Sequence, residues 1–451
     1  MKRFLLPCVL ALVFLIHLAA GFAIAARHTD FFLHHDGREY LELSESYAKY
    51  GALLSEHSRY YEVRRDFLMP EAYRIQLPPV VTGILIQMGF PPLAAAAVFC
   101  ALAVLLASWA VFDLARTMFH SERTAWFALL LFSLHPLLIQ YGVQFSSEIL
   151  FCAFLLLTFR CLCLPESDRK YVLAAAMLTL AAYSRATAFL FFPFLACWFM
   201  YNRIRALRRE GKPWLRIAPY RSVILFTLTA LLLSAPVALR NWHNFGTPSV
   251  SGYLSGFVLY NGNNRHLMRA YSADSRDFVH HMELSWNSLL ELVKTLPPET
   301  AGNPRVQSEL LAERAKEELR AMSAGEKFRL FSGKLIHYLQ PNPKSPDHSP
   351  LLYWGLTLSI SLLYLCGIAG ILLVRRRDPL LVPFLLLALT GIISHVVFNI
   401  NLRYRIPYID LPLILYSAAF LSILWDRIRR KPETEYCFSG EMRYNNSNGQ
   451  Y

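Results

Sequence analysis

Ionisable side chains stand at the ends of several long apolar segments of this chain, where a charge costs free energy. A carboxylate in such a place can take a proton from a hydroxyl nucleophile, and guanidinium groups can hold a phosphate through paired hydrogen bonds. Together these residue types suit the transfer of a group that departs from a phosphate. The residues concerned are Asp36, Glu148, Arg185, Arg240, Arg403 and Arg405.

Each of these residues also has a simpler explanation. A single arginine such as Arg240 or Arg403 can extend to lipid headgroups, and Glu148 can simply pair with Arg185. Against this, the groups come from separate segments and are expected at one depth on one face of the membrane. The grouping therefore favours a polar cavity that receives a phosphate-bearing lipid headgroup.

The segments that must position these residues are expected to be membrane helices. The 451-residue chain is 55% hydrophobic and only 17% charged, whereas soluble domains carry about a quarter charged residues. Continuous apolar runs of roughly 20 residues recur, and a backbone in lipid must form helices or a closed barrel. The sequence therefore predicts an all-α, polytopic membrane protein with about ten transmembrane helices and long external loops.

The apolar runs differ in length, and the length of each run indicates whether it crosses the membrane once, twice or not at all. The run 171–201 is too long for one crossing and predicts a hairpin that turns near Ser184 and Arg185. The segment 77–90 is too short to span and predicts an interfacial or re-entrant helix. The first run is favoured as a retained helix over a cleaved signal peptide, because it exceeds the usual apolar core of such a peptide. The expected spans are 4–26, 91–118, 125–140, 145–164, 171–201, 223–239, 351–374, 379–400 and 406–425.

The net charge of +13 is explained by basic residues in short loops beside the apolar runs, so no nucleic-acid partner is expected. With the N-terminus inside, the basic loop 202–221 is cytoplasmic and two long polar segments lie outside. The expected domains are an N-terminal transmembrane module, 1–240, with a catalytic first external loop, 27–77; an external helical loop, 241–350; C-terminal transmembrane helices, 351–431; and a disordered cytoplasmic tail, 432–451.

The first external loop gives no indication of a metal site. His34 and His35 stand beside Asp36 and are residues of a metal-binding type. Adjacent side chains in an extended loop point apart, however, so the three are not expected to share an ion. No metal and no other cofactor is expected.

Two stretches of this loop resemble the C-type membrane glycosyltransferases, the GT-C superfamily. They are HHDGREYLELSESYAKYGAL, with Asp36, and MPEAYRIQLPPVVTGILIQMG. In that superfamily an acidic residue is followed by a tyrosine, an amphipathic helix, a glycine and a proline-containing re-entry. Further stretches are similar to the dolichyl-phosphate-mannose protein mannosyltransferase-like branch, glycosyltransferase family 39-like. They are HPLLIQYGVQFSSEILF, LAAYSRATAFLFFPFLA, LSAPVALRNWHNFGTPSVSGYLSGFVLYNGNN and HVVFNINLRYRIPYIDLPLIL.

The resemblance implies a membrane glycosyltransferase that moves a sugar from a polyprenyl-phosphate donor to an acceptor glycan, lipid or protein. It also implies a multi-pass protein among the lipids of a bacterial inner membrane, with a periplasmic active site. Asp36 corresponds to the catalytic base. The donor phosphate is expected at Arg403, Arg405, Arg240 and Arg185, with Glu39, Tyr40, Glu148 and Asn241 in support.

The chain departs from this branch at the paired acids of the first loop. They read here as Asp36 and Gly37. This leaves open whether Glu39 supplies a second carboxylate.

Two other classes of protein remain open on the sequence alone. A lipid or polysaccharide transporter or flippase also places arginines in an outward cavity, although such proteins usually show internal repeats and polar residues near mid-membrane. A non-catalytic partner in an envelope assembly would bind through 241–350. Loss of the Asp36 carboxylate would hardly affect such a partner, whereas the enzyme would lose activity.

Overall fold

The computed structural model describes residues 2–34, 36–58, 63–74, 76–210, 220–271, 275–295, 303–341, 350–375 and 378–429. Most of these residues lie in helices, and the expected all-α class is confirmed. The strands among them are β1 (Leu54–Ser58) and β2 (Val63–Pro70), which pair antiparallel within the first long polar segment. The tail 432–451 lies outside the described residues.

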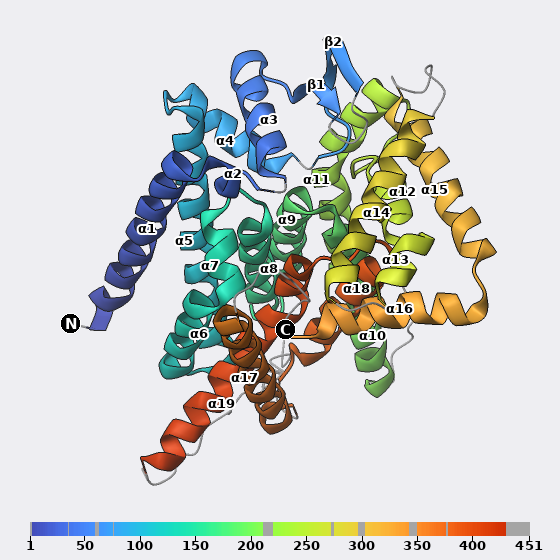
Figure 1. Cartoon of the computed structure of the whole chain (residues 1–451). Coiled ribbons are helices and arrows are strands. Elements are labelled where there is room, and N and C mark those ends of the chain that lie inside the picture. The colour runs from blue at the N-terminus through green and yellow to red at the C-terminus, as the bar shows by residue number, and fades with distance from the viewer. Residues whose placement is uncertain are drawn as a thin grey trace, which may run out of the picture.

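The apolar helices pack as one bundle, with α1 at one edge and α5 to α9 towards the middle (Figure 1). α5 contacts α1, α6 and α8, while α9 contacts α8 and α11. Near the C-terminus, α19 packs against α17 and α6. The bundle helices are α1 (Lys2–Arg27), α5 (Pro92–Phe119), α6 (Glu122–Leu134), α7 (Pro136–Val143), α8 (Glu148–Leu162), α9 (Asp168–Ser184), α10 (Phe191–Arg209), α11 (Arg221–Phe245), α17 (Pro350–Val374), α18 (Leu381–Val397) and α19 (Leu411–Ile428).

The protein is a multi-pass membrane protein, but the expected count of ten spans is not confirmed. The described residues contain six helices long and apolar enough to cross, or seven if the bent pair α6 and α7 is one span. The difference arises because several expected spans form short helices. α8 has 15 residues and α9 and α18 have 17 each, against the ~20 residues that a ~30 Å hydrocarbon layer requires.

Two helices are interrupted in ways that matter for the site. The expected single span 125–140 bends by 64° between α6 and α7, because Pro136 cannot continue a helix and keeps His135 extended (φ −69°, ψ 120°). The expected turn in 171–201 is found where α9 ends at Ser184 and Arg185 is extended (φ −153°, ψ 119°). A short 3₁₀ turn, η1 (Ala186–Leu190), then leads into α10.

α5 and α19 form the buried centre of the bundle. Of their apolar windows, 72% and 78% are buried, against 11% for α1 and 17% for α11. Alanines on α5, among them Ala96, Ala103 and Ala107, are almost fully buried, and such small side chains let neighbouring helices approach closely. The exposed apolar faces of α1 and α11 suit contact with lipid tails.

The polar segment between α11 and α17 forms a separate group of helices at one side of the bundle (Figure 1). Two small apolar clusters hold it together, and one of them includes Ala72 and Tyr73 from the first polar segment. The two polar segments are therefore packed against each other. The helices are α12 (Ser255–Gly262), α13 (Arg265–Ala270), α14 (Ser275–Lys294), α15 (Pro304–Ala321) and α16 (Ala324–Leu339).

The first polar segment folds over one end of the bundle. A short turn of helix, α2 (Thr29–Phe32), leads into α3 (Gly37–Tyr50), which packs against α4 (Leu77–Gln87). α4 is the short apolar helix expected at 77–90 and has only 11 residues. A Cβ at Gly83 would lie 2.8 Å from the Ser44 carbonyl oxygen, so glycine permits the close contact of α3 and α4.

Gly37→Ala should destabilise the protein. Gly37 is buried, and a Cβ there would lie 2.8 Å from the carbonyl oxygen of Phe145, whose N–H donates to the Phe32 carbonyl (2.9 Å). Overpacking of this kind costs about 1–3 kcal/mol, so the thermal unfolding midpoint of the purified protein in detergent should fall.

Gly325→Ala is the matched control for this substitution. It lies in the first turn of α16, and a Cβ there meets nothing within 4 Å, so its midpoint should stay the same or rise. A Gly37→Ala protein that melts with the wild type would show that this backbone contact does not constrain the loop.

Candidate functional site

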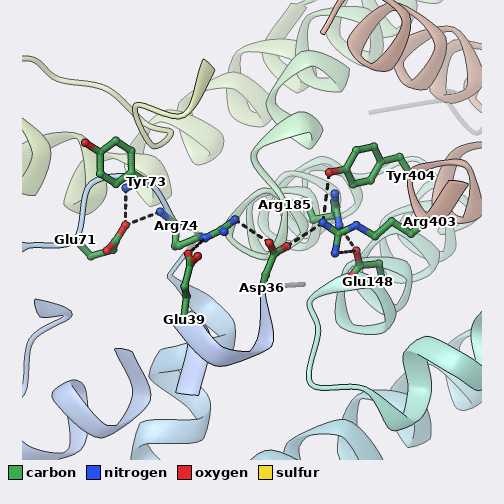
Figure 2. A network of polar contacts seen from close by, with 9 residues as sticks. All are labelled: Asp36, Glu39, Glu71, Tyr73, Arg74, Glu148, Arg185, Arg403 and Tyr404. Atoms are coloured by element: carbon green, nitrogen blue, oxygen red, sulfur yellow. Dashed lines mark hydrogen bonds and ion pairs between the residues drawn. The ribbon is translucent and has the colours of Figure 1, made fainter. Parts of the chain in front are cut away.

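Helix ends from distant parts of the sequence bring acids and arginines into one group. Figure 2 shows Asp36 with Arg74 on one side and Arg403 on the other. Five of the residues singled out in the sequence meet here, and Arg405 and Arg240 contact other partners, described below. The group, called the acid–arginine cluster, consists of Asp36, Glu39, Arg74, Glu148, Arg185 and Arg403.

Asp36 is held from both sides. Its Oδ1 lies 3.0 Å from Nη1 of Arg74, and its Oδ2 lies 3.1 Å from Nη2 of Arg403. The side chain is 16% exposed, whereas those of Arg74 and Arg403 are 8% and 7% exposed. Each guanidinium therefore has little contact with water and stabilises the ionised carboxylate between them.

Glu148 joins Arg403 to Arg185. Its Oε1 lies 3.3 Å from Nη1 of Arg403 and 2.6 Å from Nη1 of Arg185. The Glu148 side chain is 1% exposed, and removing one partner of such a buried pair costs about 3–5 kcal/mol. The expected ion pair of Glu148 with Arg185 is present. Glu148 also pairs with Arg403, which in turn pairs with Asp36.

Tyr404 lies against the two arginines nearest to Glu148. Its ring centroid is 4.6 Å from the guanidinium carbon of Arg185 and 5.1 Å from that of Arg403. The ring of His395 stacks on Tyr404 with centroids 4.5 Å apart. These contacts fix the planes of both guanidinium groups, which matters because paired hydrogen bonds to a phosphate require a defined orientation.

Asp36 stands at the start of α3, where the chain passes closely over the link between α7 and α8. The Tyr40 N–H donates to the Asp36 carbonyl (3.0 Å), and the Tyr40 ring packs edge-on against Phe145. Tyr40 is 2% exposed, so it packs in the core rather than presenting its ring to a ligand. Burial and the Asp36 carboxylate raise the pKa of Tyr40, which keeps its phenol protonated.

Glycine at position 37 has a structural cause. The backbone there lies too close to Phe145 for any side chain, so a second acid cannot stand directly after Asp36. Glu39, one helical turn along, instead forms an ion pair through Oε2 with Nε of Arg74. Glu39 therefore faces the same arginine as Asp36.

Arg74 was not singled out in the sequence, although it lies within the stretch MPEAYRIQLPP. Its position is set by Glu71, whose Oε1 accepts the backbone N–H groups of Tyr73 (2.6 Å) and Arg74 (2.9 Å). Tyr73 in turn donates to Gln307 Oε1 (3.0 Å). One arginine in a polar loop has no pattern that distinguishes it, so only its neighbours in space reveal it.

Arg240 and Asn241 lie beside Glu71 rather than among the ion pairs of the cluster. Nη2 of Arg240 donates to the Glu71 carbonyl (2.7 Å) and Nη1 to Asn241 Oδ1 (3.0 Å). Asn241 is 3% exposed and donates to the Ser249 carbonyl (2.8 Å). Arg240 therefore contacts the Glu71 loop and none of the cluster acids in the described part of the chain.

Arg405 is fully buried and pairs elsewhere. Its Nε lies 2.9 Å from Asp410 Oδ1, and its Nη1 donates to the Gln340 carbonyl. Asp410 ends a short π-helical turn, η5 (Ile406–Asp410), and its Oδ2 lies 3.5 Å from Nε2 of His135 at the bend between α6 and α7. Within the described residues, Arg405 thus pairs with Asp410 and not with Asp36. Through Asp410 it is linked to the bend between α6 and α7.

The acid–arginine cluster contains as many acids as arginines, but some of its polar atoms have no hydrogen-bond partner among the described residues. Glu39 Oε1, Glu148 Oε2 and Arg403 Nε are buried and have no hydrogen-bond partner among the described residues. A buried polar atom in this state costs about 1–3 kcal/mol. Arg403 therefore has a donor to spare, and an anionic ligand could take it without breaking an existing hydrogen bond.

Among the described residues, no group of three or more His, Cys, Asp or Glu side chains is arranged to hold a metal ion. His35, considered with His34 and Asp36 in the sequence, lies outside the described residues.

Known proteins resemble this chain in sequence and in fold. A family model described as dolichyl-phosphate-mannose-protein mannosyltransferase matches residues 80–237, which include Glu148 and Arg185. The oligosaccharyltransferase of Archaeoglobus fulgidus, solved with a tethered acceptor peptide, aligns with a TM-score of 0.52 at 15% identity, covering 95% of this chain and 51% of that chain. Both are GT-C proteins, as the sequence led us to expect. The chain shares the fold of this oligosaccharyltransferase, and about a third of it matches the mannosyltransferase family model.

Other solved GT-C structures align at similar identity. AglB from Archaeoglobus fulgidus, in complex with an inhibitory peptide and a dolichol-phosphate, aligns with a TM-score of 0.48 at 14% identity over 93% of this chain and 51% of that chain. ArnT from Cupriavidus metallidurans, bound to undecaprenyl phosphate, aligns with a TM-score of 0.37 at 15% identity over 96% of this chain and 81% of that chain. The chain thus spans about half the length of AglB. No curated protein sequence matches it.

In this chain, α16 holds the segment that carries Arg403. Lys334 is fully buried, and its Nζ donates to Asn263 Oδ1 (2.8 Å) and to the carbonyls of Val396 and Phe398 (3.0 Å each). These carbonyls lie at the C-terminal end of α18. One turn further along α16, the Tyr338 hydroxyl donates to the Tyr404 carbonyl (3.3 Å).

Lys334→Met should remove a pH dependence of stability. Burial lowers the pKa of Lys334 from 10.5 to about 7. Between these pH values the unfolded chain binds the extra proton, so this group makes the free energy of unfolding rise with pH across that window. The thermal midpoint of the wild type, relative to the variant, should therefore increase from pH 7 to pH 10, as measured on purified protein in detergent.

Lys327→Met, on the same helix but not fully buried, serves as the control and should follow the wild type at every pH. A midpoint difference between wild type and Lys334→Met that stays constant with pH would contradict the buried, titrating Lys334.

Proposed function

We propose that this protein is a membrane glycosyltransferase that moves a sugar from a polyprenyl-phosphate donor to an acceptor outside the cytoplasm. The observation that carries the proposal is the contact of Asp36 with Arg403, 3.1 Å long, which sets a proton acceptor beside a phosphate-binding group. The name of the family that matches residues 80–237 supports a dolichyl-phosphate-type sugar donor.

In the proposed reaction, the acceptor hydroxyl attacks the anomeric carbon of the donor sugar. A bond forms between the hydroxyl oxygen and that carbon, while the bond from the carbon to the phosphate oxygen breaks. The electron pair of the broken bond leaves with the polyprenyl phosphate, and the hydroxyl proton passes to Asp36. Attack from the side opposite the leaving group inverts the anomeric configuration.

Arg403 and Arg185 are the groups we assign to the donor phosphate. Both present planar guanidinium groups beside Tyr404, and Arg403 Nε has no hydrogen-bond partner in the part of the chain that the structure describes. Their positive charge would stabilise the phosphate as negative charge develops on it during bond breaking. Glu148 supports the site by holding the two arginines at a common carboxylate oxygen.

The contact between Asp36 and Arg403 also links phosphate binding to proton transfer. Two guanidinium groups stabilise the Asp36 carboxylate and so make it a weaker base. A donor phosphate at Arg403 would share the positive charge of that guanidinium with Asp36, so the carboxylate would be stabilised less. Asp36 would thereby become a stronger base when the donor is bound. Its proton acceptance would then coincide with the presence of a leaving group.

The other expected phosphate ligands take different roles in this proposal. Arg405 positions the segment that carries Arg403 through its ion pair with Asp410. Arg240 belongs to the surroundings of Glu71. Arg74 and Glu39 hold Asp36 from the side away from Arg403.

The cellular setting follows from the expected topology. We propose that segments 27–77 and 241–350 face the periplasm of a bacterial inner membrane, with 27–77 as the catalytic loop. Segments 1–240 and 351–431 supply the transmembrane helices, and 432–451 forms a disordered cytoplasmic tail. The acceptor is a glycan, lipid or protein of the cell envelope, and membrane lipids surround the bundle.

Asp36→Asn should abolish transfer while the protein remains folded, because the amide keeps the shape of the side chain and cannot take a proton. Activity is measured by mass analysis of envelope glycans in a deletion strain that expresses the variant. Asp30→Asn, on the same loop and exposed, should restore the wild-type pattern. A normal glycan pattern with Asp36→Asn would favour a transporter or an assembly partner over the enzyme.

Arg403→Lys and Arg405→Lys should differ in what they impair. Lysine cannot make paired hydrogen bonds, so Arg403→Lys should weaken the binding of undecaprenyl phosphate about tenfold, or about 1.4 kcal/mol. Arg405→Lys should chiefly lower the thermal midpoint, because its pairing with Asp410 is fully buried. Binding is measured with the purified variants in nanodiscs. Undiminished binding by Arg403→Lys would exclude it as the phosphate ligand.

A further inference from the structure

A second polar recess lies beside the acid–arginine cluster. Arg74 belongs to both, because it lines the recess and its Nη1 also lies 3.0 Å from Asp36 Oδ1. One side chain therefore separates the recess from the proposed base. The recess, called the Glu71 recess, is lined by Glu71, Arg74, Tyr183, Arg240, Asn241 and Gly252, among others.

Among the described residues, Glu71 Oε2 and Arg240 Nε make no hydrogen bond in this recess, although the two side chains attract each other electrostatically. Glu71 is 8% exposed; its Oε1 accepts two backbone N–H groups, while its Oε2 has no hydrogen-bond partner among the described residues. Arg240 donates through Nη1 and Nη2 to Asn241 and Glu71, which leaves its Nε free within the described part of the chain. Glu71 Oε2 and Arg240 Nε are therefore available to the hydroxyl groups of a ligand that enters the recess.

The charges of the recess do not suit a second phosphate. Glu71 would repel a phosphate, and Arg74 already faces Asp36 and Glu39. Burial raises the pKa of Glu71, so this group takes up a proton more readily than an exposed glutamate, and a protonated carboxyl can donate as well as accept. Mixed donors and acceptors of low net charge match neutral hydroxyl groups.

The break between α9 and η1 places the recess next to the proposed phosphate site. Arg185, at the break, directs its guanidinium to Glu148 (2.6 Å). Its near neighbours in sequence, Ala182, Tyr183 and Ala186, line the recess instead. The two sites therefore lie on either side of one turn of backbone.

We propose that the Glu71 recess binds the sugar ring of the donor, a neutral ring that carries hydroxyl groups. The inference rests on the proposed function, and it adds to it the residues that select the sugar. In such a donor one oxygen joins the ring to the phosphate, so the ring must lie beside the phosphate site. A ring hydroxyl donates to Glu71 Oε2, and another accepts from Arg240 Nε.

Glu71→Gln is the test variant. The amide oxygen can still accept the N–H groups of Tyr73 and Arg74, while an NH₂ group replaces Oε2. The probes are undecaprenyl phosphate and undecaprenyl-phosphate-linked mannose, glucose, galactose and arabinose, measured for binding to the full chain in nanodiscs. The wild type should bind at least one glycosylated probe more tightly than the bare lipid. Glu71→Gln should weaken that binding about tenfold and leave bare-lipid binding within about twofold.

Two further variants make the experiment selective. Arg240→Lys removes Nε and should show the same loss for the glycosylated probe alone. Glu45→Gln, the same chemical change at an exposed residue of α3, should bind every probe like the wild type. Thermal midpoints of all variants show whether each is folded.

The proposal is overturned if the wild type binds no glycosylated probe more tightly than the bare lipid. It is also overturned if Glu71→Gln leaves the affinities for the glycosylated probe and for the bare lipid unchanged, or if it lowers both affinities equally. Failure of the proposed function has a different signature, because undecaprenyl phosphate would then not bind the wild type or would bind Arg403→Lys equally well.

Discussion

Charges at the edge of a hydrocarbon layer need opposite charges close by, and this requirement governs how the chain folds around its site. Asp36 and Arg403 lie at opposite ends of the sequence, yet they meet at 3.1 Å. Glu148 meets Arg403 and Arg185 in the same way. Moving any of these helix ends away would leave a buried charge without its partner, so the ion pairs and the arrangement of the bundle depend on each other.

Interrupted helices place these charges. A helix satisfies its own backbone hydrogen bonds, so helix ends and breaks at membrane depth are tolerated only where protein buries them or where they line a polar cavity. Glu148 begins α8 and Arg185 follows the end of α9, while Arg403 lies between α18 and α19. The breaks that shorten several helices below a full span are thus the positions from which the acid–arginine cluster is built.

The polar helices beside the bundle contribute to the site through the backbone. α16 bonds to the segment around Arg403 through Lys334 and Tyr338. On the other side of the cluster, Tyr73 packs with residues of α12 and bonds to Gln307 of α15. The two arginines that flank Asp36 are therefore both held by the same group of helices, which couples the shape of this external region to the spacing of the site.

The sequence by itself determined the fold class, most helix positions and most members of the acid–arginine cluster. Apolar length and charge placement are local properties, so they identify helices and the unusual ions at their ends, such as Asp36, Glu148, Arg185 and Arg403. They could not reveal Arg74 or Glu71, because a charged residue in a polar loop is ordinary until its neighbours in space are known. They also did not separate Arg405 from Arg403, two residues apart, although one pairs with Asp410 and the other with Asp36. Only the tertiary structure decided these partners, because the pairing of charges depends on distances between segments that the order of residues does not fix.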